Sequence, residues 1–354
     1  MEYRHLGRSG LRVSKLCLGT MRGFTADNID AASRIMNEAV DGGVNFVDTA
    51  DCYGESEKTV GKILERENLR EKVVLATKFG WYMGKGANDF GASRGHIIEA
   101  CEASLRKLRT DHIDLYILHV VDPNVPLDEV LSALDTLVKQ GKVRYVGTSK
   151  HPVALLVESL WVSQRENLVR FVSEQPIYNL LDRRAENDLI WTALRHGLAI
   201  TPFSPLGGGI LSGKYVRGEG APEDSGLHGR TPGEDSRFTE AAVDAVEKLR
   251  PLAEERDLTV AEFSLAWLMH QPGVTAPILG ARKVEYLRSG LKASEVELTQ
   301  EELERVDEIV PPGQYVSDYY DVEIHSPLRQ RYREGARNTG AFVPDYRRRP
   351  MTDE

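Results

Sequence analysis

Short apolar runs alternate along this chain with longer stretches in which apolar residues recur every three to four positions. The runs are typical of β-strands buried on both faces, and the stretches are typical of amphipathic helices. The predicted strands are 15–18, 45–47, 73–77, 113–118, 143–147, 171–173, 199–202 and 275–279. The predicted helices are 29–41, 56–67, 96–108, 127–140, 153–166, 184–196, 240–255, 260–270 and 284–291.

Eight strand–helix units in succession predict parallel strands joined by helical crossovers, and they favour an α/β fold of the (β/α)8 TIM-barrel type. An open doubly wound sheet is the alternative, because the number of units does not establish closure. Two short runs, 3–6 and 11–13, flank Gly-Arg-Ser-Gly and predict a β-hairpin that closes the bottom of the barrel. We therefore expect a single barrel over residues 1–310 and a C-terminal extension over 311–354.

Two segments depart from the alternating pattern. The segment 206–237 is rich in glycine, contains Pro222 and Pro232, and shows neither a helix nor a strand pattern. A loop of that length in a compact domain is usually functional or disordered. The extension carries six aromatic residues and an Arg-Arg-Arg run at 347–349. It is either a solvated, partly ordered tail or a segment that folds over the barrel mouth and shapes a pocket.

Composition narrows the possible partners. The 354 residues include 45 Lys+Arg and 54 Asp+Glu, for a formal net charge of -9, which disfavours nucleic acid and anionic membranes as partners. The three cysteines (Cys17, Cys52 and Cys101) cannot all pair within the chain, so a reducing compartment is favoured over a disulfide scaffold. The first residues lack the apolar core of a signal peptide, and no apolar run is long enough to span a bilayer. We expect a cytoplasmic protein without a metal site, and we leave its oligomeric state open.

Polar side chains follow three consecutive predicted strands. Asp48 follows the second strand, with Tyr53 in the loop after it, Lys78 follows the third strand, and His119 follows the fourth. The carboxyl ends of barrel strands meet at one rim, so these four side chains are expected to converge. A lysine ammonium favours the phenolate and lowers the pKa of a nearby tyrosine, an aspartate holds the ammonium, and an imidazole can position a carbonyl oxygen. Such a set predicts a general acid that protonates an oxygen as negative charge develops on it.

Five segments at these strand ends together resemble the aldo-keto reductases, in particular the branch of the potassium-channel β subunits and bacterial reductases. They are Asp-Thr-Ala-Asp-Cys-Tyr-Gly-Glu-Ser-Glu (48–57), Ala-Thr-Lys-Phe-Gly (76–80), Tyr-Ile-Leu-His (116–119), Gly-Lys-Val-Arg-Tyr-Val-Gly-Thr-Ser (141–149) and Ser-Pro-Leu-Gly-Gly-Gly-Ile-Leu-Ser-Gly-Lys-Tyr (204–215). The similarity runs in order from about Leu6 to Ile309. It implies a (β/α)8 barrel that binds a nicotinamide cofactor without a Rossmann domain.

The resemblance also implies roles for the four converging residues. Tyr53 would be the general acid, and Lys78 would depress the pKa of Tyr53. Asp48 would pair with Lys78, and His119 would orient the carbonyl of the substrate. Each of these residues taken alone has an ordinary structural explanation, such as a buried histidine or a helix cap, but four at consecutive strand ends do not.

Further positions match cofactor contacts of the family. The implied contacts are Gly19, Thr20 and Met21 beside the nicotinamide ribose, Asp48, Ser149, Lys150 and Gln175 around the carboxamide, Phe203 against the nicotinamide ring, Ser204, Pro205, Leu206, Gly207, Gly208 and Lys214 at the pyrophosphate, and Gly280, Arg282, Lys283 and Tyr286 at the adenosine end. Lys150 stands where the family usually has asparagine, which alters carboxamide binding or adds charge at the rim. Arg282 and Lys283 suit a 2′-phosphate, so NADPH is predicted over NADH.

The substrate is expected to be a small carbonyl compound, such as a keto-sugar or a natural-product ketone. Phe24, Trp81, Tyr82 and Phe90 predict an aromatic-walled pocket, and His119 is expected to contact the substrate as well. Cys52 is either a redox-sensitive thiol or a small residue packed behind the loop.

Three other functions can be compared with the same residues. An NADPH-binding regulatory subunit of the channel-β type would keep the same four residues. A lyase with Lys78 as a Schiff base gives Tyr53 and the phosphate loop no joint role. The run 208–215 nearly forms a Walker A loop, but Tyr215 replaces the Ser/Thr that would hold Mg²⁺, so an NTPase is rejected.

Overall fold

The computed structural model describes residues 1–316 except 82, 85, 87, 123–124 and 224. Its strands are β1 (Tyr3–His5), β2 (Arg12–Ser14), β3 (Cys17–Gly19), β4 (Phe46–Asp48), β5 (Val74–Phe79), β6 (Ile113–Leu118), β7 (Val143–Ser149), β8 (Phe171–Gln175), β9 (Ala199–Ile200) and β10 (Ile278–Gly280). Its α-helices are α1 (Ile29–Asp41), α2 (Ser56–Arg66), α3 (Arg94–Leu108), α4 (Leu127–Lys139), α5 (Val153–Glu166), α6 (Leu189–His196), α7 (Glu240–Glu254), α8 (Val260–His270), α9 (Val284–Ala293) and α10 (Gln300–Ile309). Short 3-10 helices are η1 (Ala26–Asn28), η2 (Arg70–Lys72), η3 (Arg184–Glu186) and η4 (Gly207–Ser212).

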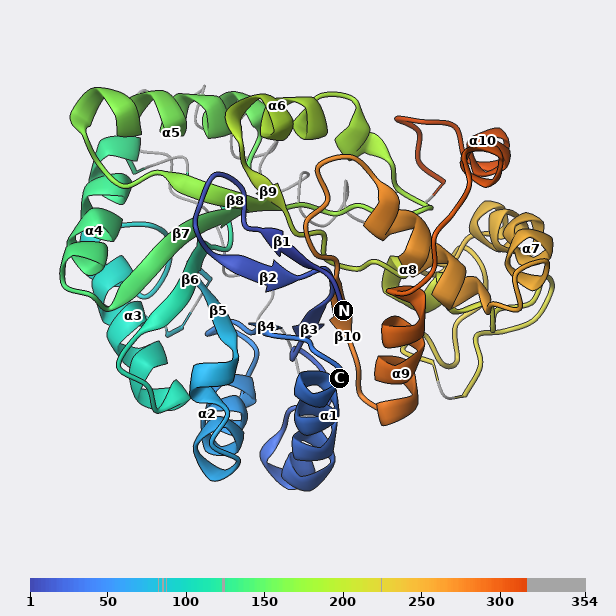
Figure 1. The fold of residues 1–354 in the computed structure, drawn as a ribbon, viewed down its shortest axis with the longest axis horizontal. Coiled ribbons are helices and arrows are strands. Elements are labelled where there is room, and N and C mark those ends of the chain that lie inside the picture. The colour runs from blue at the N-terminus through green and yellow to red at the C-terminus, as the bar shows by residue number, and fades with distance from the viewer. Residues whose placement is uncertain (82, 85, 87, 123–124, 224, 317–354) are drawn as a thin grey trace.

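Eight parallel strands form one sheet in the order β10-β3-β4-β5-β6-β7-β8-β9, and helices surround it (Figure 1). Backbone hydrogen bonds join the two ends of this order. The amide of Thr275 donates to the carbonyl of Ile200 at 2.8 Å, and the amide of Ile278 donates to that of Pro202 at 2.8 Å. Because the last segments bond to each other, the sheet closes, and the predicted (β/α)8 barrel is confirmed over the open doubly wound sheet.

The antiparallel hairpin β1–β2 lies across the end of the barrel that faces the viewer in Figure 1. Leu6 and Val13 are fully buried there and belong to the apolar cluster that fills the barrel interior. Gly7 has φ +58°, and a Cβ at this position would lie 2.5 Å from the carbonyl oxygen of Val172. Only glycine tolerates both conditions, so the Gly-Arg-Ser-Gly turn lets the hairpin sit directly on the strands.

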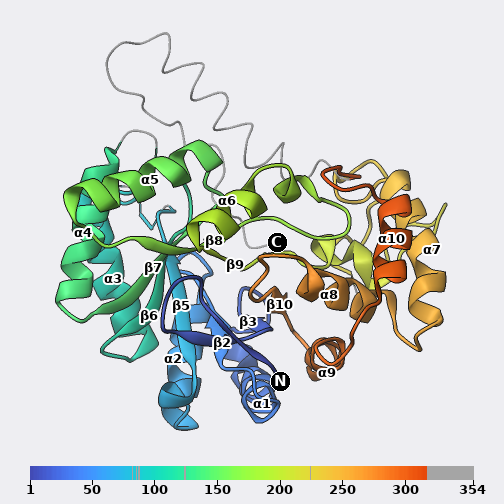
Figure 2. The same ribbon diagram turned by 45° about the horizontal axis from the view of Figure 1, so that its top comes forward.

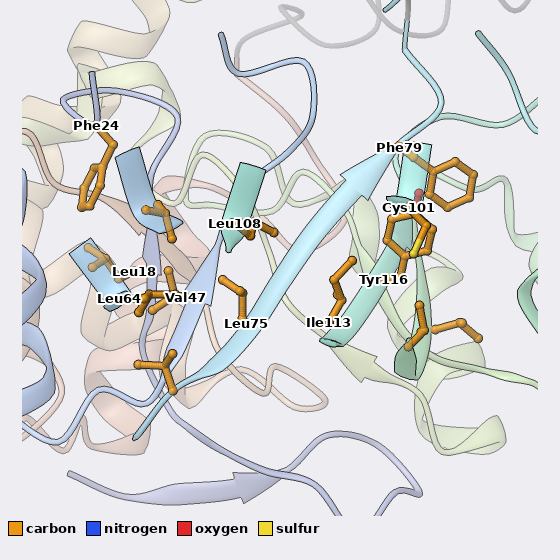
Figure 3. Packing of buried hydrophobic residues seen from close by; sticks show 14 of the residues in the cluster. Leu18, Phe24, Val47, Leu64, Leu75, Phe79, Cys101, Leu108, Ile113 and Tyr116 are labelled. Atoms are coloured by element: carbon orange, nitrogen blue, oxygen red, sulfur yellow. The ribbon is translucent and has the colours of Figure 1, made fainter. Parts of the chain in front are cut away.

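A second apolar layer lies between the strands and the helices. Figure 3 shows side chains of β3 to β6, among them Leu18, Val47, Leu75 and Tyr116, packed with side chains from neighbouring segments. These strand residues are almost completely buried. A further cluster gathers where α7, α8 and α10 lie close together on one side of the barrel (Figure 2). Burial on both faces explains why the strands read as unbroken apolar runs.

The structure adds two helices to those predicted, and it divides the predicted helix 184–196 into η3 and α6. Helix α10 was not predicted, although Thr299 and Glu302 form a capping box that marks its start. In the segment 206–237, where neither helix nor strand was expected, Gly207–Ser212 form the short helix η4 with Ile210 and Leu211 buried. The three glycines of η4 have positive φ, a conformation outside the regular helix. The sequence of η4 therefore shows no helical pattern.

The predicted boundary between barrel and extension stays a prediction. Residues 311–316 run beside 181–183, where the amide of Arg183 donates to the carbonyl of Gln314 at 2.9 Å and that of Val316 donates to Leu181 at 2.8 Å. The expectations for residues 317–354, including the aromatic residues after Tyr315 and the arginine run, lie outside the described residues.

Candidate active site

Lys78 lies at the centre of the rim formed by the carboxyl ends of the strands. Its side chain is completely buried, and its Nζ donates to Asp48 Oδ1 at 2.5 Å and to the carbonyl oxygen of Thr49 at 2.9 Å. Strands β4 and β5 pair in parallel with Asp48 opposite Ala76, so Lys78 lies two residues further along the neighbouring strand. Burial alone would favour the neutral amine, but the carboxylate of Asp48 raises the pKa of Lys78. The pair therefore holds a charged ammonium inside the barrel mouth.

Tyr53 reaches this ammonium from the loop between β4 and α2. Lys78 Nζ lies 3.3 Å from the Tyr53 hydroxyl oxygen and 4.8 Å from the centre of its ring. Burial raises the pKa of Tyr53 to about 12, and the opposing effect of Lys78 does not cancel it. Lys78 lowers this pKa as expected, but desolvation of the phenolate outweighs the attraction of the ammonium, so the net shift is upward. Tyr53 keeps its proton.

His119 follows β6 on the other side of Tyr53. The two rings meet edge to face with centroids 5.8 Å apart, and Trp81 lies in the same way at 5.9 Å. Burial, together with the nearby lysines 150 and 78, holds the pKa of His119 well below its usual range, so the imidazole is neutral. Its Nδ1 lies 3.6 Å from the sulfur of Cys52. A neutral imidazole in this position can donate one hydrogen bond to a carbonyl oxygen.

The surroundings of Cys52 disfavour a redox-sensitive thiol and agree with a small residue packed behind the loop. Burial raises the pKa of its thiol to about 12, so the reactive thiolate is not formed near neutral pH. Its contact with His119 Nδ1 instead helps to fix the orientation of the imidazole. The only sequence signal for this role was its position next to Tyr53 in the same loop.

Two buried carboxyl groups near the site were not singled out from the sequence. Both carboxyl oxygens of Asp51 lack a hydrogen-bond partner among the described residues, and burial raises the pKa of Asp51 to about 8. Glu174, in β8, accepts from the hydroxyl of Thr148 at 2.5 Å and from the amide of His151 at 3.2 Å. Burial raises the pKa of Glu174 to about 7. Acidic residues in the middle of apolar runs were the available signal.

The residues expected around the carboxamide lie beside Asp48. Gln175 Nε2 donates to Asp48 Oδ2 at 3.1 Å, and Ser149 Oγ donates to the carbonyl of Gln175 at 2.9 Å. Thr20 binds the carbonyl oxygen of Asp48 at 3.0 Å through its hydroxyl, so it ties the end of β3 to that of β4. Gly19 ends β3 beside them, whereas Met21 is 51% exposed. These polar groups surround the free side of the Asp48 carboxylate.

The backbone after β9 has the form of an anion-binding cradle. Ser204, Gly207, Gly208 and Gly209 all have positive φ. A Cβ on Gly208 would lie 2.8 Å from Cδ of Arg237, so the loop and this arginine fit closely only because the residue is glycine. Successive residues of this kind can form concavities that bind phosphate, so the turn fits a phosphate group of a dinucleotide. The guanidinium of Arg237 beside it is paired with Asp235 at 2.7 Å. The role of Lys214 at the pyrophosphate stays a prediction. Pro205 and Leu206 belong to the same turn.

The loop after β10 meets the loop after β3. A Cβ on Gly23 would lie 3.0 Å from Cα of Arg282. Arg282 and Lys283 are exposed, and Lys283 Nζ lies 5.9 Å from the ring centre of Tyr286. Gly280 ends β10. These residues form a basic edge on the loop after β10, and their expected role at the adenosine end stays a prediction.

The prediction that Phe24 lines the substrate pocket is wrong. Phe24 is 1% exposed and packs in the apolar layer between strands and helices (Figure 3), so it cannot line an open pocket. Trp81 lies against His119, as expected of a pocket wall. Phe90 is half-buried in the same loop, which the amide of Gly91 closes onto the carbonyl of Gly80 at 3.1 Å. Tyr82 lies outside the described residues.

Comparison with known proteins identifies the family. The model of the aldo/keto reductase family matches residues 15–311. This chain belongs to the aldo/keto reductase family. An uncharacterized oxidoreductase of Bacillus subtilis, YrpG, is 38% identical over 90% of this chain and 99% of its own length. A probable voltage-gated potassium channel subunit beta of Oryza sativa is 34% identical over 88% of this chain and 97% of its own, and the L-glyceraldehyde 3-phosphate reductase of Escherichia coli K12 is 31% identical over 89% and 94%.

Family membership establishes the class of reaction. Aldo/keto reductases are NAD(P)H-dependent oxidoreductases that act on small carbonyl compounds, and this chain is one of them. Within residues 1–316, leaving out the undescribed positions, no helix is long and apolar enough to cross a membrane. The same part of the chain holds no group of three or more His, Cys, Asp or Glu residues arranged to bind a metal.

Proposed function

We propose that this protein reduces an aldehyde or ketone to the alcohol with NADPH, and that Tyr53 is the general acid. The observation that carries the proposal is the buried chain of contacts from Asp48 through Lys78 to the hydroxyl of Tyr53, 3.3 Å from the ammonium. The bound cofactor would supply the hydride. The chain itself would supply the proton and the stabilisation of the developing negative charge on the oxygen.

Each of the four residues has a defined task in this proposal. Tyr53 holds a proton at its hydroxyl, because its pKa of about 12 keeps it protonated until negative charge develops on the substrate oxygen. Lys78 stabilises the phenolate that remains after transfer, and Asp48 keeps Lys78 charged. His119 is neutral and donates a hydrogen bond that orients the carbonyl oxygen.

Replacing Tyr53 by phenylalanine tests this assignment. Tyr53→Phe should bind NADPH as the native protein does and reduce carbonyl compounds about 10²–10⁴-fold more slowly, since general acid catalysis contributes that much. Cofactor oxidation is followed with a panel of aldehydes, and binding is followed by fluorescence titration. Near-native turnover in this variant would exclude Tyr53 as the acid.

The preference for NADPH rests on the basic edge after β10. Arg282 and Lys283 would face the 2′-phosphate, and hydrogen bonds between such charged groups contribute roughly 1.5–3 kcal/mol. The double replacement of both residues by alanine should weaken NADPH binding about 10- to 100-fold and spare NADH. Equal losses for both cofactors would mean that the two cations act elsewhere, and tighter native binding of NADH would refute the premise.

The alternative is an NADPH-binding regulatory subunit, which the plant relative named as a channel β subunit keeps open. Such a subunit would bind NADPH with an affinity similar to that of a reductase. It would not oxidise NADPH at a useful rate with any carbonyl compound in the panel. The E. coli relative is named for a phosphorylated aldehyde, so glyceraldehyde 3-phosphate belongs in that panel. The expected cytoplasmic location likewise stays a prediction.

A further inference from the structure

A second lysine points into the same site and forms no ion pair with a carboxylate of the described residues. Lys150 directly follows β7, and its Nζ lies 5.4 Å from the ring centre of Trp81 and 5.9 Å from that of Phe203. Trp81 is the wall beside His119, and Phe203 is the residue expected against the nicotinamide ring. The ammonium therefore lies between the proposed substrate side and the proposed cofactor side of the site.

The backbone of Lys150 is held in a conformation that non-glycine residues rarely adopt. Six non-glycine residues in the described chain have positive φ, and four of them follow helices, where this conformation is common: Asn68, Arg109, Asn167 and Asp257. The other two are Lys150, with φ 58°, and Ser204, with φ 52°. Both follow a strand at the rim of the site. Such local strain persists where the surrounding structure enforces it, and it gathers at functional sites.

The charge of Lys150 is not compensated within the described chain. No described carboxylate forms an ion pair with Lys150, whereas Lys78 is fully engaged by Asp48. The nearest acidic influence is Glu174, whose carboxyl group is already bonded to Thr148 and His151. A cation surrounded by two rings and a neutral imidazole is stabilised by a ligand of opposite charge.

We propose that Lys150 binds an anionic group of the substrate, so that the preferred substrates are aldehydes or ketones carrying a carboxylate or a phosphate a few bonds from the carbonyl. This inference rests on the proposed reductase function and names its substrate class. It places the anion next to the carbonyl that His119 orients, with Trp81 covering the apolar part of the molecule. In this assignment Lys150 contacts the substrate rather than the carboxamide of the cofactor.

Matched pairs of aldehydes test the proposal. Succinic semialdehyde is compared with butanal, and glyceraldehyde 3-phosphate with glyceraldehyde, so that carboxylate and phosphate are tested separately. We expect kcat/KM to be roughly 10- to 100-fold higher for the anionic member of at least one pair, the range expected of a charged hydrogen bond. Lys150→Met should lose this preference, so that kcat/KM falls further for the anionic member of the pair than for the neutral one, and NADPH affinity is measured alongside. Lys150→Arg should keep it, and Lys139→Met, at a side chain that is 74% exposed on α4, serves as the control.

The pH dependence provides a second readout. Burial lowers the pKa of Lys150 to about 8, so the preference for the anionic aldehyde should fall as the pH rises through 8 in the native enzyme. Arginine does not titrate there, and Lys150→Arg should therefore lack this alkaline limb. Of the groups that interact with Lys150, the thiol of Cys52 stays neutral and Lys78 stays charged across this range, and Glu174, with a pKa of about 7, is already largely ionised at pH 8. His119 and His151 have lowered pKa values and stay neutral there.

The outcomes separate the inference from the function on which it rests. If the neutral aldehydes are reduced but neither anionic partner is preferred, the inference is wrong and the reductase function stands. Equal loss for both members of a pair in Lys150→Met, or loss of NADPH affinity, would assign Lys150 to the cofactor instead. If no aldehyde is reduced, the proposed function fails and the inference fails with it.

Discussion

The ends of β5 and β7 each carry a lysine into one site, Lys78 fully buried and Lys150 half-buried, and the two lysines are held in opposite ways. At the end of β5, Lys78 meets the carboxylate of Asp48, and its pKa is raised. At the end of β7, Lys150 meets two aromatic rings, and its pKa is lowered to about 8. The same side chain is thus a permanent charge in one place and a titratable charge in the other. Partners across neighbouring strands, and not the residue type, determine which it is.

The difference suggests two tasks within one rim. A lysine that is already paired can tune Tyr53 without attracting other anions. An unpaired lysine leaves its charge available to a ligand, at the cost of stability in the empty site. Replacing the two lysines should therefore change the stability of the fold in opposite directions. A third prediction, on the carboxyl group of Asp51, extends the same comparison.

The largest effect is expected at Lys78. Lys78→Met should reduce turnover by about 10²–10⁴-fold through Tyr53 and should destabilise the fold by about 3–5 kcal/mol, because it leaves Asp48 buried without a partner. Urea unfolding measures the stability, and NADPH oxidation measures the turnover. Adding Asp48→Asn to this variant should recover much of the stability and none of the activity. If the double variant is no more stable than the single one, the pair is not the source of the loss.

Asp51 should show how far a buried carboxyl group with no hydrogen-bond partner among the described residues lowers the stability of the native state. Its pKa is raised to about 8, so the native state keeps its proton while the unfolded chain releases it from about pH 4 upward. The native protein therefore loses stability as the pH rises from about 4 to 8, and Asp51→Asn should abolish that loss. We expect the variant to be more stable by a few kcal/mol at pH 8 and about equal at pH 4. Thermal unfolding at both values checks this, and parallel pH profiles of the two proteins would show that Asp51 is ionised in the folded state.

The smallest effect is expected on stability at Lys150. Its lowered pKa means that the unfolded chain binds a proton more readily than the native state between about pH 8 and the usual lysine range. Native stability should rise with pH across that interval, and Lys150→Met should be more stable than the native protein at pH 7 by about 1 kcal/mol. This is opposite in sign to Lys78→Met. A destabilised Lys150→Met would point to a partner for Lys150 and would remove the contrast between the two strand ends.

Much of the fold of this protein, and the place of its candidate active site, can be predicted from local patterns in the sequence. Apolar periodicity places α1, α5 and α8 with the bounds that the structure has, because an amphipathic helix must bury one face whatever its partner. Alternation of strands and helices leads to the barrel, and barrel geometry brings the strand ends carrying Asp48, Lys78 and His119 to one rim.

What the tertiary structure alone decided is the state of each side chain. That Phe24 is buried in the core, that Tyr53 has a pKa of about 12 and that Lys150 lies against Trp81 all depend on groups far away in the sequence. A pKa is the balance between lost solvation and nearby charge, and both are set by distances across the folded barrel. The sequence therefore determined which chemical groups meet at the rim, and the packing around them determined how each one is charged.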